Sequence, residues 1–433
     1  MDWYPTGSKG IKNSMGLNLF EKIILSHSRQ DNIRVNDTVE VDIDGMMIHD
    51  FFAPFCIDKF HEMGFEKVVK PDRVVFVYDH LIPTAFVDDN RHHRVIEAFT
   101  ASHDITHIHR SDGVCHQLMH EQGYVRPGEI ILGADSHTVT YGAIGALATG
   151  IGYTEMAAVL GTGKLWLKVA PVIKLNVRGT LPKGVFSKDV ILGILGRIRN
   201  DGANYRVLEF AGPVIEDMSI DSRLTLSNMS VEAGAKAGII AADGKTVQYL
   251  KRHFPSDELN LVASDIDAEY EAVIEFDVSQ MSPLVACPFN VDNVGSVTDH
   301  SDVTIDQAFL GSCTNGRLED LAIASRVLEG RRVHPNVRFY VVPASREIFL
   351  QAVRKGYIGT LVAAGAVVGH PACSLCAGIS GGILEDGERI ISANNRNFYG
   401  RMGGSQVEIY LGSPATVAAS AIEGRISDCR KYL

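Results

Sequence analysis

Alternating strands and helices in the last third of the chain limit its fold more than any other feature. Apolar runs at 304–310 and 337–342 predict strands, and the runs 319–329 and 347–355 predict helices. Strand, helix, strand and helix at this spacing are typical of a parallel α/β sheet. We therefore predict an α/β fold of mostly parallel sheets flanked by helices.

The chain is long enough, at 433 residues, for two or three domains with substantial cores. Near Pro171 the pattern changes to an alternating run at 172–178, which predicts a half-exposed strand that opens a new domain. A second boundary is expected between 282 and 292, where two prolines occur. The predicted organisation is a flexible leader over 1–16, followed by domains over 17–170, 171–281 and 282–433.

Three cysteines indicate a metal centre. Cys373 and Cys376 form a C-x₂-C pair, and Cys313 lies upstream in the segment 311–317, Gly-Ser-Cys-Thr-Asn-Gly-Arg. Thiolates bind soft metals and iron–sulfur clusters, and three protein ligands would leave one metal position open. A redox dithiol is disfavoured because the glycine-rich residues after Cys376 are a poor helix start. Spacing alone leaves zinc open. Two arginines in the polar segment 394–401 would suit a substrate with a hydroxyl and carboxylates.

Polar residues follow two apolar runs that predict buried strands. Asp79 and His80 follow the run 73–78, and Asp135-Ser-His137 follows the run 129–133. The carboxyl ends of strands are where open α/β sheets bind ligands. A serine triad is not expected from Asp-Ser-His, because adjacent residues do not converge as nucleophile, base and orienting group, and the G-x-S-x-G turn is absent.

Charge and composition exclude several classes of partner. The net charge is −11 and the pI is about 5.8, so no electrostatic footprint for nucleic acid or anionic membrane is present. The sequence has no apolar run of membrane-spanning length, and its start lacks the apolar core of a secretory signal. The seven cysteines are sparse and odd in number, which argues against a disulfide scaffold and favours a reducing cytoplasm.

The ordered motifs resemble a known family. The segment 311–317, the C-x₂-C pair and the run Asn-Arg-Asn-Phe-Tyr-Gly-Arg at 395–401 are similar to those of the aconitase family, in particular the large subunits of the isopropylmalate isomerase and homoaconitase branch. The resemblance runs from about Leu17 to the C-terminus. It implies a three-domain aconitase-like large subunit and a [4Fe–4S] cluster with one open iron. It also implies that the cluster ligands are Cys313, Cys373 and Cys376. One departure is Ala372, where many relatives carry glycine.

The resemblance also implies roles for other residues, through motifs such as Asp-His-x-x-Pro-Thr at 79–84, Gly-Val-Cys-His-Gln at 113–117 and the segment 227–234. The residues expected to handle protons are Asp79, His80, His116, Asp135, His137 and Glu232. Those expected to contact substrate are His49, Ser136, Asn395, Arg396 and Arg401, while Asn315 would support the cluster.

The activity implied by the resemblance is that of a hydro-lyase or isomerase acting on a hydroxylated di- or tricarboxylate. An isopropylmalate-type isomerase of leucine biosynthesis fits best, with homoaconitate, citramalate and dimethylmalate enzymes as alternatives. The family's base is a serine in a swivelling domain that this chain lacks. We therefore expect a small partner subunit, in a heterodimer or heterotetramer. A zinc hydrolase and an RNA-binding iron sensor are the alternatives from other classes.

Overall fold

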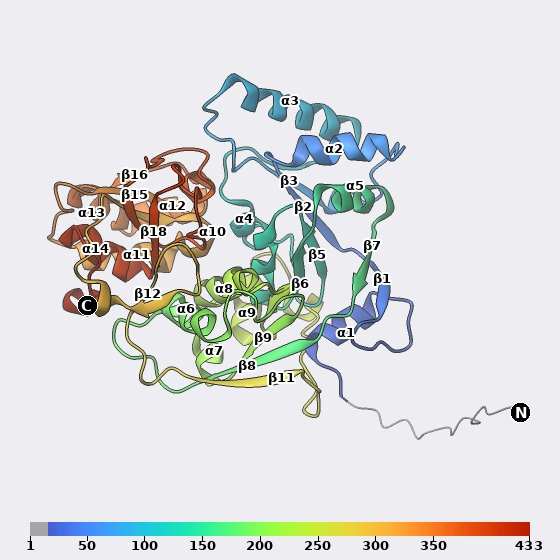
Figure 1. Ribbon diagram of the computed structural model, residues 1–433. Coiled ribbons are helices and arrows are strands. Elements are labelled where there is room, and N and C mark those ends of the chain that lie inside the picture. The colour runs from blue at the N-terminus through green and yellow to red at the C-terminus, as the bar shows by residue number, and fades with distance from the viewer. Residues whose placement is uncertain (1–15) are drawn as a thin grey trace, which may run out of the picture.

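The structure, a computed structural model, describes residues 16–433 and has the predicted α/β architecture. Figure 1 shows three parts, each built on one sheet: blue to teal at the upper right, green at the lower centre, and orange to red at the left. The predicted leader lies outside the described residues except for Gly16, which forms a bridge with Ala268. None of the described helices is both long and apolar enough to cross a membrane.

The first sheet has five parallel strands in the order β4-β3-β2-β5-β6. Its strands are β2 (Gly45–His49), β3 (Val74–Val77), β4 (His107–His109), β5 (Ile130–Gly133) and β6 (Leu147–Gly150). Its helices are α2 (Ala53–Glu62), α3 (Val87–Ser102), α4 (Cys115–Glu121), α5 (Tyr153–Thr162) and the 3₁₀ segments η1 (Pro71–Arg73) and η2 (Ser136–Ile144).

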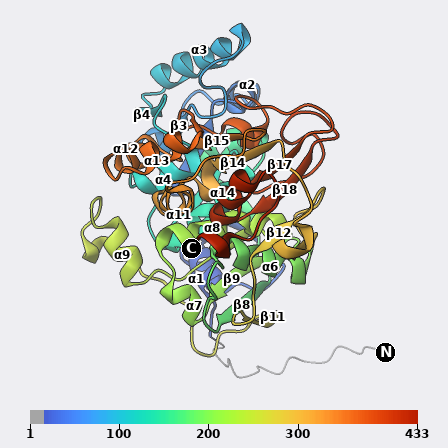
Figure 2. The ribbon, with the colours of Figure 1, turned by 90° about the vertical axis from the view of Figure 1, so that its left-hand side faces the viewer.

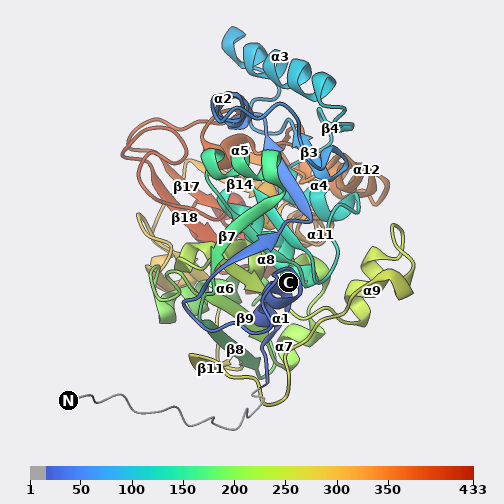
Figure 3. The same cartoon turned by 90° about the vertical axis from the view of Figure 1, so that its right-hand side faces the viewer.

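Both faces of this sheet are covered, which explains its continuous apolar strands. Met46 and Ile48 of β2 pack in the apolar cluster that contains α2, whereas Met47 packs with α4 and η2. Alternate side chains of one strand therefore serve opposite layers. Seen from the two sides, α3 covers the outer edge of this part (Figure 2, Figure 3).

The second sheet has four parallel strands in the order β10-β9-β8-β11. Its strands are β8 (Val172–Arg178), β9 (Val207–Ala211), β10 (Ala237–Ile239) and β11 (Ala272–Asp277). Its helices are α6 (Ser187–Ile198), α7 (Pro213–Asp217), α8 (Ile220–Met229), α9 (Gly244–Leu250), η3 (Ser230–Ala233) and η4 (Ser256–Glu258). Helix α9 projects from the body of the molecule (Figure 2).

The third sheet has seven strands in the order β13-β12-β18-β17-β14-β15-β16, and it departs from a purely parallel arrangement at one edge. Strand β12 pairs antiparallel with both β13 and β18. The strands are β12 (Leu284–Ala286), β13 (Val294–Ser296), β14 (Gln307–Gly311), β15 (Arg338–Val342), β16 (Val367–Val368), β17 (Arg389–Ser392) and β18 (Glu408–Gly412). The helices are α10 (Ser312–Asn315), α11 (Leu318–Leu328), α12 (Arg346–Arg354), α13 (Tyr357–Ala364), α14 (Pro414–Glu423), η5 (Val297–His300), η6 (Ser374–Ala377) and η7 (Cys429–Tyr432).

Helix α1 (Leu19–Ser26) and the antiparallel pair β1 (Thr38–Asp42) and β7 (Lys164–Lys168) complete the fold. The three large sheets fall inside the three predicted domains, but the apolar clusters run across the predicted boundaries. Val172 and Val207 pack with the first part, and Phe309 packs with the second. The domain limits therefore remain a prediction.

The carboxyl ends of the first and third sheets meet. The backbone N–H of Cys373 donates to the carbonyl of Asp79 at 2.7 Å, which joins the C-x₂-C loop to the end of β3. A bridge between Gly113 and Ser345 joins the same two parts. This junction brings together the motifs singled out in the sequence.

Candidate active site

The three cysteines predicted to bind metal lie close together in the junction. Cys313 is in α10, directly after β14. Cys373 directly precedes η6, and Cys376 lies within η6. All three are free and buried. The side chain of Asn395 lies between Cys313 and the C-x₂-C pair. Its amide nitrogen is 3.8 Å from the Cys313 sulfur, and its oxygen is 3.7 Å from the Cys376 sulfur.

Two further amides, which we did not predict, lie beside these sulfur atoms. Asn228 of α8 places its amide nitrogen 3.2 Å from the sulfur of Cys313. Asn394 places its own 3.7 Å from the sulfur of Cys376. Both residues lie in motifs already recognised, Asn228 in the segment 227–234 and Asn394 beside Asn395. N–H groups directed at sulfur stabilise thiolates and tune iron–sulfur centres.

The donor set fits a soft metal centre. The three thiols differ in acidity. Burial raises the pKa of Cys313 to about 12, and the hydrogen bond with Cys376, together with burial, holds the pKa of Cys373 well above its usual range. The same hydrogen bond and the positive charge of Arg401 hold the pKa of Cys376 well below its usual range, against the opposing effect of burial. Buried thiols beside amide donors and a cation can form thiolates, which are the ligands that iron–sulfur clusters use. Cys115, a buried cysteine outside the predicted ligand set, also has its pKa raised, by burial and by the charge of Asp79.

Two stacked imidazoles lie at the ends of β2 and β3. The rings of His49 and His80 are 4.0 Å apart. His80 Nδ1 is 2.6 Å from Asp79 Oδ1, and the His80 backbone N–H donates to Asp50. Burial lowers the pKa of His80, but the charges of Asp79 and Asp50 outweigh it and raise that pKa to about 9. His80 is therefore held as a cation that can donate a proton.

His49, unlike His80, is neutral. Burial and the positive charge of His80 lower its pKa to about 4, so the ring is neutral. Neither ring nitrogen has a hydrogen-bond partner among residues 16–433, and the Oδ2 atom of Asp135 is 3.9 Å from Nε2. An unpaired polar group in a buried position fits a residue that meets a ligand.

Four more predicted residues form one hydrogen-bonded chain. His116 Nε2 lies 2.7 Å from Asp135 Oδ1, and the same oxygen accepts from the His137 backbone N–H. His137 Nε2 then lies 2.9 Å from Glu232 Oε1. Although burial raises it, the pKa of Asp135 is held well below its usual range by His116 and His137. The chain can relay or hold protons within the junction.

The two arginines of the polar segment have different surroundings. Arg396 Nε donates to Glu232 at 2.8 Å, and its Nη2 donates to Ser136 Oγ at 3.0 Å. Arg401 Nε, by contrast, has no partner among the described residues. The Arg401 side chain is half-buried, and burial lowers its pKa less than the neighbouring Cys376 and Cys373 raise it. A guanidinium with an unpaired N–H suits an anion. The structure thus leaves Arg401 open for a carboxylate, whereas Arg396 is already held by Glu232.

Asn315 contacts the scaffold rather than the sulfur atoms. Its amide donates to Asp320 at 2.9 Å and to Thr225 at 3.2 Å. Arg317, fully buried, donates to the carbonyls of Thr314, at 2.7 Å, and Cys313. These contacts fix the backbone that carries Cys313. Arg317 was not predicted to be a site residue, although it ends the segment 311–317.

Comparison with known proteins agrees with this geometry. The model of the aconitase family (aconitate hydratase) matches residues 21–303 and 295–424. The 3-isopropylmalate dehydratase large subunit 1 of Methanopyrus kandleri is 46% identical over 97% of this chain and 100% of its own length. The 3-isopropylmalate dehydratase large subunit of Aquifex aeolicus is 43% identical over 95% of this chain and 97% of its own.

A solved structure has a similar fold. The crystal structure of Thermococcus kodakaraensis aconitase X, in its holo form, aligns with a TM-score of 0.51 and 13% identity, covering 89% of this chain and 95% of that one. Fold and site together define an α/β protein with buried thiols and two arginines where two sheets meet. The chain belongs to the aconitase family.

Proposed function

We propose that this chain is the cluster-binding large subunit of a hydro-lyase that dehydrates and rehydrates a hydroxy dicarboxylate, with 3-isopropylmalate as substrate. The observation that carries the proposal is the likeness, at 43–46% identity over at least 95% of the chain, to the relatives named 3-isopropylmalate dehydratase large subunit. Homocitrate, citramalate and dimethylmalate are the alternative substrates.

We further propose that Cys313, Cys373 and Cys376 hold a [4Fe–4S] cluster with one open iron. The contacts of Asn395 to the sulfur atoms of both Cys313 and Cys376 support this ligand set. When bound, the cluster supplies a Lewis acid that makes hydroxide a better leaving group. The rest of the chemistry belongs to side chains of the protein.

His80 is the proposed donor to the leaving hydroxyl group. Dehydration breaks a C–O bond and the neighbouring C–H bond and forms a C=C bond, with hydroxide leaving as water once it gains a proton. With its pKa raised to about 9, His80 carries that proton at neutral pH. Asp79 orients it, and the neutral ring of His49 meets the substrate beside it.

Arg401 and Ser136 are the proposed carboxylate contacts. Arg401 Nε is free among the described residues, and Ser136 is held by Arg396. The side chains of Arg396 and Glu232 keep each other and His137 in place. In this arrangement Arg396 contributes a second, pre-organised positive charge to the carboxylate site.

The base that removes the proton α to the carboxylate would come from a second chain of roughly 160–200 residues. The words "large subunit" in the relatives' names support a smaller partner. Exposed aromatic side chains near the site offer it a docking surface: Phe55, Phe86, Tyr153, Phe398 and Tyr399. Phe55 and Tyr153 belong to an aromatic group that reaches His49 through Phe52.

The test is an anaerobic assay of the purified chain with and without its small subunit. The substrates are 2- and 3-isopropylmalate, homocitrate, citramalate and dimethylmalate. The proposal expects turnover only with both chains, and fastest on the isopropylmalates. Full turnover by the isolated chain would refute the two-chain assignment. Faster turnover of another acid would make that acid, and not 3-isopropylmalate, the substrate.

A further inference from the structure

A lysine from the second sheet reaches the cysteine-bearing loops and has no role in the mechanism above. Lys188 lies in the first turn of α6 and is 0% exposed. Its ammonium donates to the carbonyls of Ala393, at 2.7 Å, and Asn394, at 2.5 Å, and to the side-chain oxygen of Asn315, at 3.3 Å. An ammonium has three N–H donors, so these three acceptors satisfy it completely.

The three acceptors lie in the two segments that surround the sulfur atoms. Asn315 is two residues after Cys313 in α10. Ala393 and Asn394 directly precede Asn395, and Asn394 also donates its amide to Cys376. A single ammonium therefore ties the Cys313 segment to the segment that carries Asn395 and Arg396.

The nearby carboxylates are engaged elsewhere. Both oxygens of Asp189 accept backbone N–H groups, from Leu284 and Phe186, at 2.8 Å each. Both oxygens of Asp320 are bonded by Asn315 and Arg317. No carboxylate forms an ion pair with Lys188 in the part of the chain that the structure describes. A fully buried cation without an ion pair is costly unless another anion is close.

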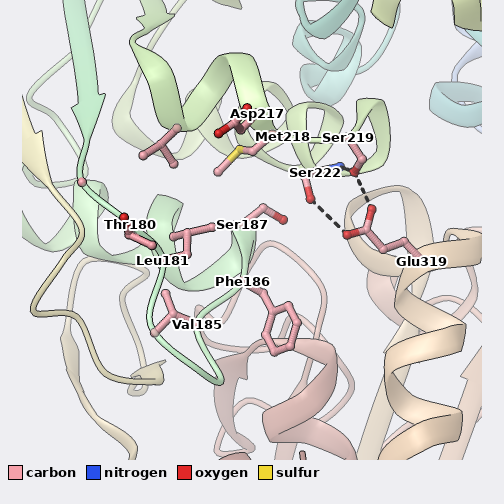
Figure 4. Close-up of a pocket in the computed structure, with 12 residues that line it drawn as sticks. Thr180, Leu181, Val185, Phe186, Ser187, Asp217, Met218, Ser219, Ser222 and Glu319 are labelled. Atoms are coloured by element: carbon pink, nitrogen blue, oxygen red, sulfur yellow. Dashed lines mark hydrogen bonds between the residues drawn. The ribbon is translucent and has the colours of Figure 1, made fainter.

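Solvent does not reach Lys188, so hydration does not reduce the free-energy cost of burying its charge. A pocket of about 390 Å³ opens beside the start of α6 and is lined by Phe186 and Ser187 (Figure 4). Lys188 does not line it. The polar groups at the rim of this pocket bond one another, since Glu319 accepts from both Ser219 and Ser222 (Figure 4). Burial lowers the pKa of Lys188 to about 7, against the opposing effects of Asp320, Cys376, Asp189 and Cys313, in that order. The two carboxylates are bonded as described above, so the sulfur atoms of Cys376 and Cys313 are the nearby groups that a bound cluster would make more negative.

We propose that Lys188 is a positioning residue and the buried counter-charge of the cysteine-bound cluster. This inference rests on the proposed function, because it needs an anionic cluster on Cys313, Cys373 and Cys376. Lys188 fixes the two segments by its three hydrogen bonds, and its positive charge stabilises the cluster and thiolates more as their negative charge grows. The charge therefore favours the reduced cluster and slows its loss.

The experiment replaces Lys188→Met and measures the midpoint potential of the cluster by a dye-mediated titration followed by electron paramagnetic resonance. A parallel measurement follows the rate of iron loss in air. Arg223→Met is the matched control. Arg223 is a cation with only 1% exposure that bonds Ile215, Glu216 and Asp243, none of them in the cysteine-bearing segments.

The expected result is a lower potential and an iron-loss rate at least tenfold higher for Lys188→Met. Arg223→Met should lower the melting temperature with the potential unchanged. Lys188→Gln, which keeps N–H donors without the charge, should fold if Lys188→Met does not, and should show the same lowered potential.

An unchanged potential in the folded Lys188 variants would overturn the inference, as would an equal shift in Arg223→Met. Its failure is distinguishable from failure of the proposed function. In the first case the unmodified chain carries an iron–sulfur cluster that ignores Lys188, and in the second it carries none.

Discussion

The charge of His80 can be removed without removing the ring, by the substitution Asp79→Asn. Asp79 is fully buried and accepts two hydrogen bonds, from His80 Nδ1 at 2.6 Å and from the Cys115 backbone N–H at 2.7 Å. An asparagine keeps the shape but has no charge and only one acceptor oxygen. After burial, which lowers it, the Asp79 carboxylate is the largest influence on the pKa of His80.

The size of the effect follows from that pKa. With a pKa of about 9, His80 is about nine-tenths protonated at pH 8. If the variant returns it to the ordinary value of about 6.5, only about 3% is protonated at pH 8. Loss of the donor alone should then lower kcat/KM about thirtyfold at pH 8, but only about 1.3-fold at pH 6, where both forms are mostly protonated.

Stability should follow the same titration with a defined sign. The pKa of His80 is raised on folding, from an ordinary 6.5 to about 9. The corresponding stabilisation of about 3 kcal/mol, to which Asp50 and Asp135 also contribute, is complete below about pH 6.5 and is lost as the pH rises through 9. The unfolding free energies of wild type and Asp79→Asn should therefore differ most below pH 6.5.

The assay is kcat/KM of the two-chain enzyme from pH 5.5 to 10, with urea unfolding of the large subunit over the same range. Asp112→Asn is a matched control, because Asp112 pairs with His109 at 2.9 Å outside the site. In Asp112→Asn, kcat/KM should still fall at alkaline pH with a midpoint near pH 9, as in the wild type. A loss of activity in Asp79→Asn that is equal at pH 6 and pH 8 would refute the role given to His80.

Three further substitutions test other parts of the site. Arg401→Lys should lower kcat/KM at least about 100-fold while the melting temperature and metal content stay unchanged, because an ammonium cannot bind a carboxylate bidentately; a matching fall in melting temperature would make the arginine structural. Glu232→Gln should raise KM about tenfold or more by releasing Arg396, and an unchanged KM would contradict it. Arg317→Met should lower the unfolding free energy by about 3–5 kcal/mol, measured in urea, because the buried carbonyls of Thr314 and Cys313 and the side chain of Gln117 lose their donor; a change under 1 kcal/mol would contradict it.

The fold was accessible from the sequence because its signals are local. Continuous apolar runs predicted β3 and β5, and the structure places strands there at Val74–Val77 and Ile130–Gly133. The antiparallel pairing of β12 was not predicted, because short strands of three residues carry almost no periodicity. The aconitase family was recognised through ordered motifs, and the family match confirms it.

The contacts between distant segments could not be predicted in this way. Lys188 was not among the predicted site residues, and only the fold shows that it reaches Asn394, far along the chain. His93 of α3 is another such residue, since its Nε2 lies 3.2 Å from Asp50 and helps hold the end of β2. Arg396 was expected, with Arg401, to contact substrate, and the structure in addition pairs Arg396 with Glu232. The roles of the individual site residues remain predictions.

The most direct test of the central claim is the iron and acid-labile sulfide content of the chain purified without air. The account predicts close to four irons and four sulfides per chain, the loss of one iron on mild oxidation, and loss of the visible absorbance in Cys313→Ser, Cys373→Ser and Cys376→Ser. Cys115→Ser, a buried cysteine outside the ligand set, should keep the cluster. One zinc per chain without labile sulfide would contradict the account.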